Sequence, residues 1–198
     1  MYCYTLYILH SLGINSKTFK DYNREIIMNP KVVQTIIEML QDRGYNIEKG
    51  GLHIQGKKGD ETLKIYHDDS SKIGIKEIKI ILEDMETNQV NQGILVYSGS
   101  ITHYAKQFLK DDVQGIQYFH EDELTFNITH HTFVPEHIKV SNEVKQTLLN
   151  KYKVGAKNLP WIFSTDPVVK YHGGKVGDVF KIIRDNSDGR SVNYRICI

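Results

Sequence analysis

The sequence has few residues of several kinds that would each point to a particular class of protein. Its 198 residues include 2 cysteines, 4 prolines and 1 tryptophan, and its only alanines are Ala105 and Ala156. Cys3 and Cys197 lie at opposite ends of the sequence without a C-x-x-C pair. This spacing gives no disulfide framework and indicates a reducing compartment.

Long apolar runs and excess charge are also lacking. No apolar run approaches the roughly 20 residues that a membrane-spanning helix needs, so no membrane association is predicted. The net charge of +1 excludes a free-standing basic DNA-binding protein. The charge is unevenly spread, because residues 130–198 carry 11 Lys and Arg against 6 Asp and Glu, whereas residues 1–129 carry 14 against 18. This asymmetry predicts two domains with different neighbours.

Turn and strand signals are densest in the last forty or so residues of the sequence. Asp166-Pro167 favours a capped helical turn, which Gly173-Gly174 would end. Val179–Arg184 is typical of a strand, and Asp185–Gly189 is rich in turn residues. Arg190–Ile198 alternates apolar even-numbered residues with mostly polar odd-numbered ones, as a half-buried strand does. The sequence therefore predicts a C-terminal β-hairpin.

Upstream, helical and strand patterns alternate. A capped helix is predicted at Asn29–Arg43, because Asn29 and Pro30 suit its start and Gly44 its end. The further predicted helices are Lys72–Met85, Thr102–Leu109 and Glu143–Tyr152. The predicted strands are Leu52–Gln55, Thr62–His67, Gly93–Tyr97, Gly115–His120 and Leu124–Thr129. This alternation predicts an α/β domain before residue 130.

The C-terminal motifs resemble a known family. D-P-V-x-K-Y-x-G-x-K-x-G-D-V-x-K-I-I-R at residues 166–184, followed by G-R-x(3)-Y-R, is similar to the C-terminal domain of the fifth common subunit of eukaryotic RNA polymerases, a domain that archaeal RNA polymerases also contain. Asn127–Thr129, His131 and Val134–His137 resemble the family's domain junction. Weaker matches occur in the family's order at Gln41–Tyr45, Ile73–Lys76, Ile78, Lys79, Met85 and Ala105–Gln107.

The resemblance covers about residues 31–198 and implies a domain organisation. Residues 1–27 would be an unmatched extension. Residues 28–129 would form an α/β jaw-type domain with a shape similar to restriction endonucleases. Residues 130–198 would form a small α+β assembly domain that ends in the hairpin. The chain would be a non-catalytic subunit of a DNA-directed RNA polymerase, without catalytic residues, cofactor or metal.

The resemblance also implies partners and contact residues. The N-terminal domain would approach the phosphate backbone of downstream duplex DNA through Ser100, Thr102, His103 and Lys106, because a helix that begins near Thr102 would point free amides outward. An ordinary capped surface helix is the alternative.

The C-terminal domain would dock on the largest polymerase subunit, among other polymerase subunits. The residues predicted for this interface are Lys170, Tyr171, Arg184, Arg190, Tyr194 and Arg195. A nucleic-acid patch is the alternative for these side chains. Trp161 is predicted in the core, with an interface anchor as the alternative.

Other chemistry competes with this assignment. Asp60, Asp68, Glu77 and Lys79 contain the E-x-K of metal-dependent nucleases, although Glu77 and Lys79 fall in a predicted helix. His130, His131 and His137 cluster at the junction, with His103 and His120 nearby, but they lack a cysteine that would favour zinc. Gly173, Gly174, Lys175 and Gly177 lack the full phosphate-loop pattern. A freestanding transcription regulator is the remaining rival.

Localisation follows from the same assignment. A cellular polymerase subunit would be nuclear. The scarcity of alanine beside abundant Ile, Lys and Asn suggests an AT-rich genome, such as that of a large DNA virus. A viral subunit would be found in the virion or in the host cytoplasm or nucleus.

Overall fold

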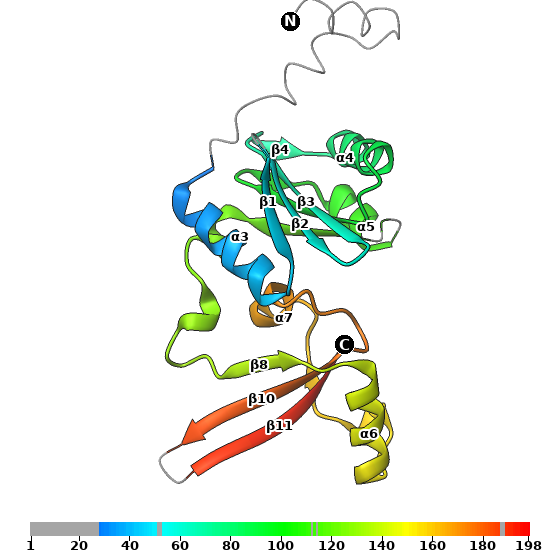
Figure 1. The fold of residues 1–198 in the computed structure, drawn as a ribbon. Helices are drawn as coiled ribbons and strands as arrows, with labels where there is room; N and C mark the ends of the chain where they lie inside the picture. The colour runs from blue at the N-terminus through cyan, green and yellow to red at the C-terminus, as the bar shows by residue number, and fades with distance from the viewer. Residues whose placement is uncertain (1–27, 51–52, 112, 114, 187–188) are drawn as a thin grey trace, which may run out of the picture.

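The computed structural model describes residues 28–50, 53–111, 113, 115–186 and 189–198. Two principal β-sheets lie one beyond the other along the molecule (Figure 1). The first sheet has five strands and belongs to the N-terminal part, and the second has four strands and belongs to the C-terminal part. The mixed α/β class is confirmed. The predicted extension, residues 1–27, lies outside the described residues.

The five-stranded sheet has a parallel core and an antiparallel edge. Its order is β1-β2-β3-β5-β7, in which β3, β5 and β7 run parallel and β1 and β2 are antiparallel neighbours. The strands are β1 (Asn46–Gly50), β2 (His53–Lys58), β3 (Glu61–Asp68), β5 (Gln92–Tyr97) and β7 (Ile116–His120). Helices α4 (Ile75–Thr87) and α5 (His103–Asp111) connect the parallel strands, as parallel pairing requires.

Helices cover both faces of this sheet, which explains why β5 is a continuous apolar run. Ile94 and Val96 pack against α3 (Pro30–Asp42) on one face. Leu95 and Tyr97 pack with residues of α4 and α5 on the other. The helix predicted from residue 29 is confirmed, and the Asn29 side chain accepts a hydrogen bond from the backbone N–H of Lys31.

Several local predictions were wrong. Leu124–Thr129 is not a strand, because the chain forms the 3-10 helices η1 (Glu121–Leu124) and η2 (Ile128–His130). The Asn127 side chain accepts the N–H of Thr129, which starts η2 in place of a strand ladder. Strand β1 was not predicted. The first two residues of the helix predicted at Lys72–Met85 instead form β4 (Lys72–Ile73), which pairs with β6 (Ser100–Ile101).

The four-stranded sheet contains the predicted C-terminal hairpin. Its order is β8-β10-β11-β9, and the strands are β8 (Glu136–Lys139), β9 (Trp161–Ile162), β10 (Val179–Asn186) and β11 (Gly189–Cys197). The helices of this part are α6 (Asn142–Tyr152), η3 (Ala156–Asn158) and α7 (Pro167–Tyr171). No helix among the described residues has the length and apolar character to cross a bilayer.

The simple alternation predicted for the last strand was partly wrong. Cys197 was placed on the polar side, yet it is 1% exposed and packs with Ile162, Val169 and Phe180. Ile198 was placed on the apolar side, yet it is 37% exposed. The short strand β9 pairs beside Cys197 at the edge of β11, and α7 supplies Val169 against one face, so this end of β11 is enclosed. Burial raises the pKa of the Cys197 thiol, which stays protonated.

Candidate functional site

The end of α3 and the end of α7 meet in a polar contact between the two parts of the chain. The Arg43 guanidinium donates to the carbonyl oxygen of Tyr171 through Nε and to that of Lys170 through Nη2, both at 2.8 Å. Both carbonyls belong to the last turn of α7, where the helix itself supplies no donor; that of Lys170 also accepts the N–H of Gly173 at 3.0 Å. Burial lowers the pKa of Arg43 to about 10, so the side chain stays charged near neutral pH. Arg43 therefore caps α7 from a distant helix.

The Tyr171 hydroxyl extends this contact. It donates to Asp42 Oδ2 at 2.7 Å and accepts a hydrogen bond from Asn127 Nδ2 at 2.9 Å. Asn127 also donates to Glu38 Oε2 at 2.9 Å. Burial, together with the hydrogen bond to Asp42, raises the pKa of the Tyr171 phenol, which therefore remains a donor. We call Asp42, Arg43, Asn127 and Tyr171 the interlock.

Lys170 and Gly173 complete the surroundings of the interlock. Lys170 forms an ion pair with Glu123 and lies 4.6 Å from the centre of the Phe119 ring. Gly173 has a φ of +63°, and a Cβ there would lie 3.3 Å from Arg43 Cζ. Glycine suits this position both for its backbone conformation and for the approach of Arg43.

The interlock corrects part of the predicted subunit interface. Tyr171 is 3% exposed, so its side chain serves contacts within the chain and does not lie on an outer surface. The Lys170 ammonium forms an ion pair with Glu123, which is also a contact within the chain. The residues of the interlock belong to three motifs that the sequence analysis identified. The spacing of these motifs along the sequence could not show that they meet in the fold.

The remaining predicted interface residues divide between two faces of the hairpin. Opposed residues of an antiparallel pair share a face, and successive residues alternate. Arg190 opposes Asp185 and Tyr194 opposes Lys181, which places both on one face. Arg184 opposes Ser191 and Arg195 opposes Phe180, on the other face. The structure therefore does not gather the four residues on a single surface.

An open apolar area accompanies Arg190 and Tyr194. Val192, which is 45% exposed, opposes Ile183, and Ile138 and Tyr194 flank Lys181. We call Ile138, Arg190, Val192 and Tyr194 the open hairpin face. Sequence periodicity missed Ile138, because β8 is short and does not alternate regularly.

Trp161 is not a core residue. It is 62% exposed, and the neighbouring Phe163 is 65% exposed. Ile162, between them, is buried, so the strand direction turns Trp161 and Phe163 outward. The predicted core position was wrong, and the alternative of an interface anchor stays a prediction.

The predicted DNA-contact residues lie together at the start of α5. Thr102 Oγ1 accepts the N–H of Ala105 at 3.2 Å and so caps the helix. His103 and Lys106 are exposed on the first turn, and Ser100 is exposed in β6. This geometry leaves both interpretations of the sequence open, because a capped surface helix and a phosphate-facing helix share it.

The nuclease set is not brought together. Asp60 precedes β3 and Asp68 ends it, so eight residue steps of extended chain separate them by about 26 Å. Glu77 accepts the N–H of Gly74 at the start of α4, and Lys79 is exposed on the same helix. The structure therefore gives no support to a shared metal site for these four residues.

The histidine and glycine clusters also have structural roles. His137 Nδ1 lies 2.7 Å from the carbonyl oxygen of Pro135, and His130 lies 4.0 Å from Glu38. Within the described part of the chain, no three His, Cys, Asp or Glu residues are placed to hold a metal ion. Gly173 and Gly177 have positive φ, a backbone conformation that glycine adopts in turns.

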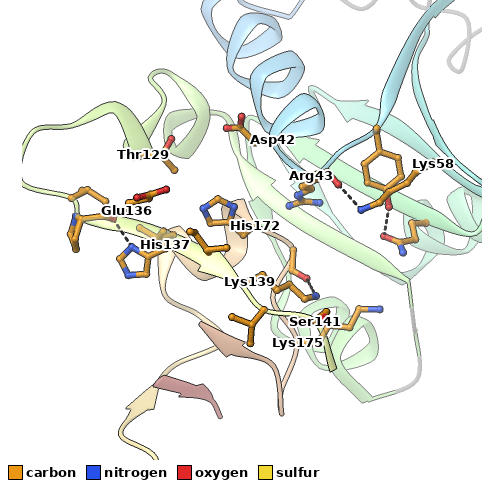
Figure 2. Close-up of a pocket in the computed structure, with 18 of the residues that line it drawn as sticks. Asp42, Arg43, Lys58, Thr129, Glu136, His137, Lys139, Ser141, His172 and Lys175 are labelled. Atoms are coloured by element: carbon orange, nitrogen blue, oxygen red, sulfur yellow. Dashed lines mark hydrogen bonds between the residues drawn. The ribbon is translucent and has the colours of Figure 1, made fainter. Parts of the chain in front are cut away.

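A cleft separates the two sheets beside the interlock (Figure 2). Its volume is about 900 Å³. Residues 134–141, which include β8, form one side, and Asp42, Arg43 and Lys58 contribute from the N-terminal part. His172 also lines the cleft, and burial lowers the pKa of its imidazole, which is therefore neutral near pH 7.

Known proteins resemble this chain over most of its length. Residues 126–197 match the family described as RNA polymerase Rpb5, C-terminal domain. The subunit rpabc1 of DNA-directed RNA polymerases I, II, and III from Dictyostelium discoideum is 34% identical over 200 residues, covering 90% of this chain and 100% of the relative. The RPABC1 subunit of Caenorhabditis elegans is 32% identical over 199 residues, covering 85% and 94%.

Among solved structures, the restriction endonuclease AspBHI superposes with a TM-score of 0.34 and 14% identity, over 49% of this chain and 30% of its own. A likeness at this level does not test the predicted endonuclease-like shape. The relatives are similar throughout their own length, and the motif-bearing C-terminal part matches the family directly. The chain therefore belongs to the RPABC1 (Rpb5) family of shared RNA polymerase subunits, which confirms the resemblance seen in its motifs.

Proposed function

We propose that this chain is a non-catalytic subunit of a DNA-directed RNA polymerase, located in the nucleus if the polymerase is cellular. The observation that carries the proposal is the similarity to shared polymerase subunits over 94–100% of their own length. Purification of the tagged full chain is expected to recover the large polymerase subunits; recovery as a lone monomer would support the freestanding regulator instead.

The C-terminal part is proposed to dock on the largest subunit through the open hairpin face. This face combines an arginine, a tyrosine and aliphatic side chains, the residue types enriched where protein partners meet. Arg190 is held near Glu136 and Asp185, at 3.6 and 3.7 Å, so its guanidinium is oriented before a partner arrives. We expect Tyr194 and Val192 to supply most of the apolar contact.

The N-terminal part is proposed to act as a jaw beside downstream duplex DNA. Residues 28–129 would form this jaw domain and residues 130–198 the assembly domain. The interlock supports this division of roles, because it ties α3 of one part to α7 of the other by hydrogen bonds between groups with fixed geometry. A surface near DNA would then keep its orientation relative to the docking surface.

Replacing Lys106 by glutamate is expected to weaken contact with downstream DNA. A lysine beside the exposed start of α5 would neutralise one phosphate. In a plot of the logarithm of DNA crosslinking against the logarithm of salt concentration, the slope should therefore become less steep by about one unit. The measurement is crosslinking of downstream duplex DNA to the assembled polymerase over a series of salt concentrations. Sequence preference should not change, because a phosphate contact reads no bases.

Lys110→Glu is the matched control for this measurement. Lys110 is also exposed and carries the same charge, but it lies in the last turn of α5, away from the helix start. The Lys110→Glu substitution should therefore leave the salt dependence of DNA crosslinking unchanged. Equal effects of the two substitutions, or no effect of either, would remove the support for a DNA contact at the start of α5.

A further inference from the structure

The outer edge of β8 is an unpaired strand edge that faces the cleft. β8 pairs with β10 on one side, and the described residues place no strand on the other (Figure 1). The N–H of Val140 donates to the carbonyl oxygen of Val179 at 3.0 Å. Because residues that bond across an antiparallel pair alternate, the backbone groups of Ile138 also point toward β10, whereas those of His137 and Lys139 point outward.

The outward backbone groups of β8 form no hydrogen bonds among the described residues. No residue within the described ranges donates to or accepts from the outward N–H and C=O groups of His137 and Lys139. A strand added to a sheet lies about 4.8 Å from its neighbour, and the cleft leaves space beside this edge. Its volume of about 900 Å³ is within the range of about 300–1,000 Å³ that ligand pockets occupy.

The carboxylates that line the cleft are already engaged. Asp42 accepts from the Tyr171 hydroxyl at 2.7 Å, and Glu61 accepts from the Tyr45 hydroxyl at 3.2 Å. Glu136 lies 3.6 Å from the Arg190 guanidinium. Each of these carboxylates therefore already has a donor or a cation nearby, and the lining carries four cationic side chains, Arg43, Lys58, Lys139 and Lys175, against three carboxylates.

Two of the three lysines that line the cleft, Lys58 and Lys175, have no carboxylate partner among the described residues. Lys58 Nζ donates to a neutral group, the carbonyl oxygen of Arg43, at 2.7 Å. Lys139 is paired, because its Nζ lies 2.8 Å from Asp178 Oδ2 and 3.3 Å from the carbonyl oxygen of Gly173; the backbone N–H of Lys175 donates to the same Asp178 oxygen at 2.7 Å. The Lys175 ammonium has no partner within the described ranges, and Lys175 lines the cleft together with Lys139 and Ser141 (Figure 2). Acidic groups at this end of the cleft would therefore be favoured.

We propose that the cleft receives an extended, acidic segment of another subunit of the same polymerase, which adds as a strand to the outer edge of β8. Main-chain bonds to His137 and Lys139 would hold the segment, and its carboxylates would lie near Lys139 and Lys175. Pro135 comes directly before β8, so the added ladder would be about four residues long. The proposal rests on the proposed function, because it assigns the partner to the assembled enzyme.

Amide hydrogen exchange tests the added strand directly. The amides of His137 and Lys139 are expected to exchange about tenfold or more slowly in the purified polymerase than in the free full-length chain, because ladder bonds protect backbone amides. Exchange is measured residue by residue by mass spectrometry on the free chain at two concentrations and on the intact polymerase.

His137→Pro removes the outward N–H without removing a bond to β10, a change that edge strands tolerate. His137→Ala is the matched control, because it loses the imidazole but keeps the N–H. We expect the proline variant to keep the unfolding temperature of the alanine variant and to lose the protection at Lys139 in the assembled polymerase.

Each other outcome overturns the inference in a distinguishable way. Normal assembly with unchanged exchange at His137 and Lys139 would overturn the added strand and leave the polymerase assignment of the chain intact. If the two amides are already protected in the free chain, another segment of this chain pairs with the edge of β8. If that protection grows with protein concentration, a second copy of the chain pairs with it. Absence of the chain from any polymerase would overturn both proposals.

Discussion

Replacing Arg43 by alanine is expected to lower the free energy of unfolding by about 3 kcal/mol. The substitution removes two charge-assisted hydrogen bonds and leaves the carbonyl group of Tyr171 without its donor, whereas that of Lys170 keeps the N–H of Gly173. For a chain of this length the unfolding temperature should fall by roughly 6–12 °C. The measurement is chemical and thermal denaturation of the full chain followed by circular dichroism.

Three further variants separate the interlock from a general effect of charge. Arg184→Ala removes an exposed arginine of the hairpin and should change stability by less than about 0.5 kcal/mol. Arg43→Lys keeps the charge but cannot form the planar pair of bonds, so it should recover only part of the loss. Tyr171→Phe should cost about 1–2 kcal/mol through the bonds with Asp42 and Asn127. Equal stability of Arg43→Ala and the unmodified chain would mean that water replaces the guanidinium and that the interlock does not join the two parts.

Deleting Tyr194–Ile198 is expected to abolish incorporation of the chain into the polymerase. The deleted residues pair with β10 on one side and supply every partner of β9 on the other. They include the buried Ile196 and Cys197, and the carbonyl oxygen of Ile198 accepts the N–H of Ser164. Without them the C-terminal sheet loses its continuous ladder, so the docking surface cannot form. The measurement is the amount of the chain that co-purifies with the largest subunit.

Tyr194→Ala distinguishes loss of the fold from loss of a contact. This variant keeps the backbone pairing of β11, so it should remain folded. If the open hairpin face docks, the variant should bind the polymerase about tenfold or more weakly, as expected for removal of an aromatic anchor. Normal incorporation of the deletion variant would overturn docking through this part of the chain. If the deletion variant fails to incorporate but Tyr194→Ala incorporates normally, docking uses a surface other than the open hairpin face.

The cleft and the open hairpin face would bind a partner through different kinds of groups. The open hairpin face presents side chains, so substitutions there change affinity through buried contact. The outer edge of β8 presents backbone groups, so it responds to proline but little to alanine. Arg190 links the two regions, because it lies 3.6 Å from Glu136, the first residue of β8. We therefore expect substitutions at Arg190 to affect both surfaces.

The amino-acid sequence by itself determined the family, the alternation of helices and strands before residue 130, and the C-terminal hairpin. These features depend on neighbouring residues: a cap such as Asn29 or Asp166, a continuous apolar strand such as β5, or a motif of fixed spacing. Each is set within about twenty residues, where side-chain periodicity and backbone preference act directly.

Only the tertiary structure decided which side chains meet. Arg43 and Tyr171 are 128 residues apart, and nothing in the spacing of their motifs indicates that one caps the helix of the other. The arginines predicted to form one interface divide between two faces, because the register of β10 and β11 sets the direction of each side chain. Cys197 is buried and Trp161 is exposed because β9 adds beside β11 and α7 covers one face. Packing between distant elements fixes these positions, and local sequence patterns carry little information about it.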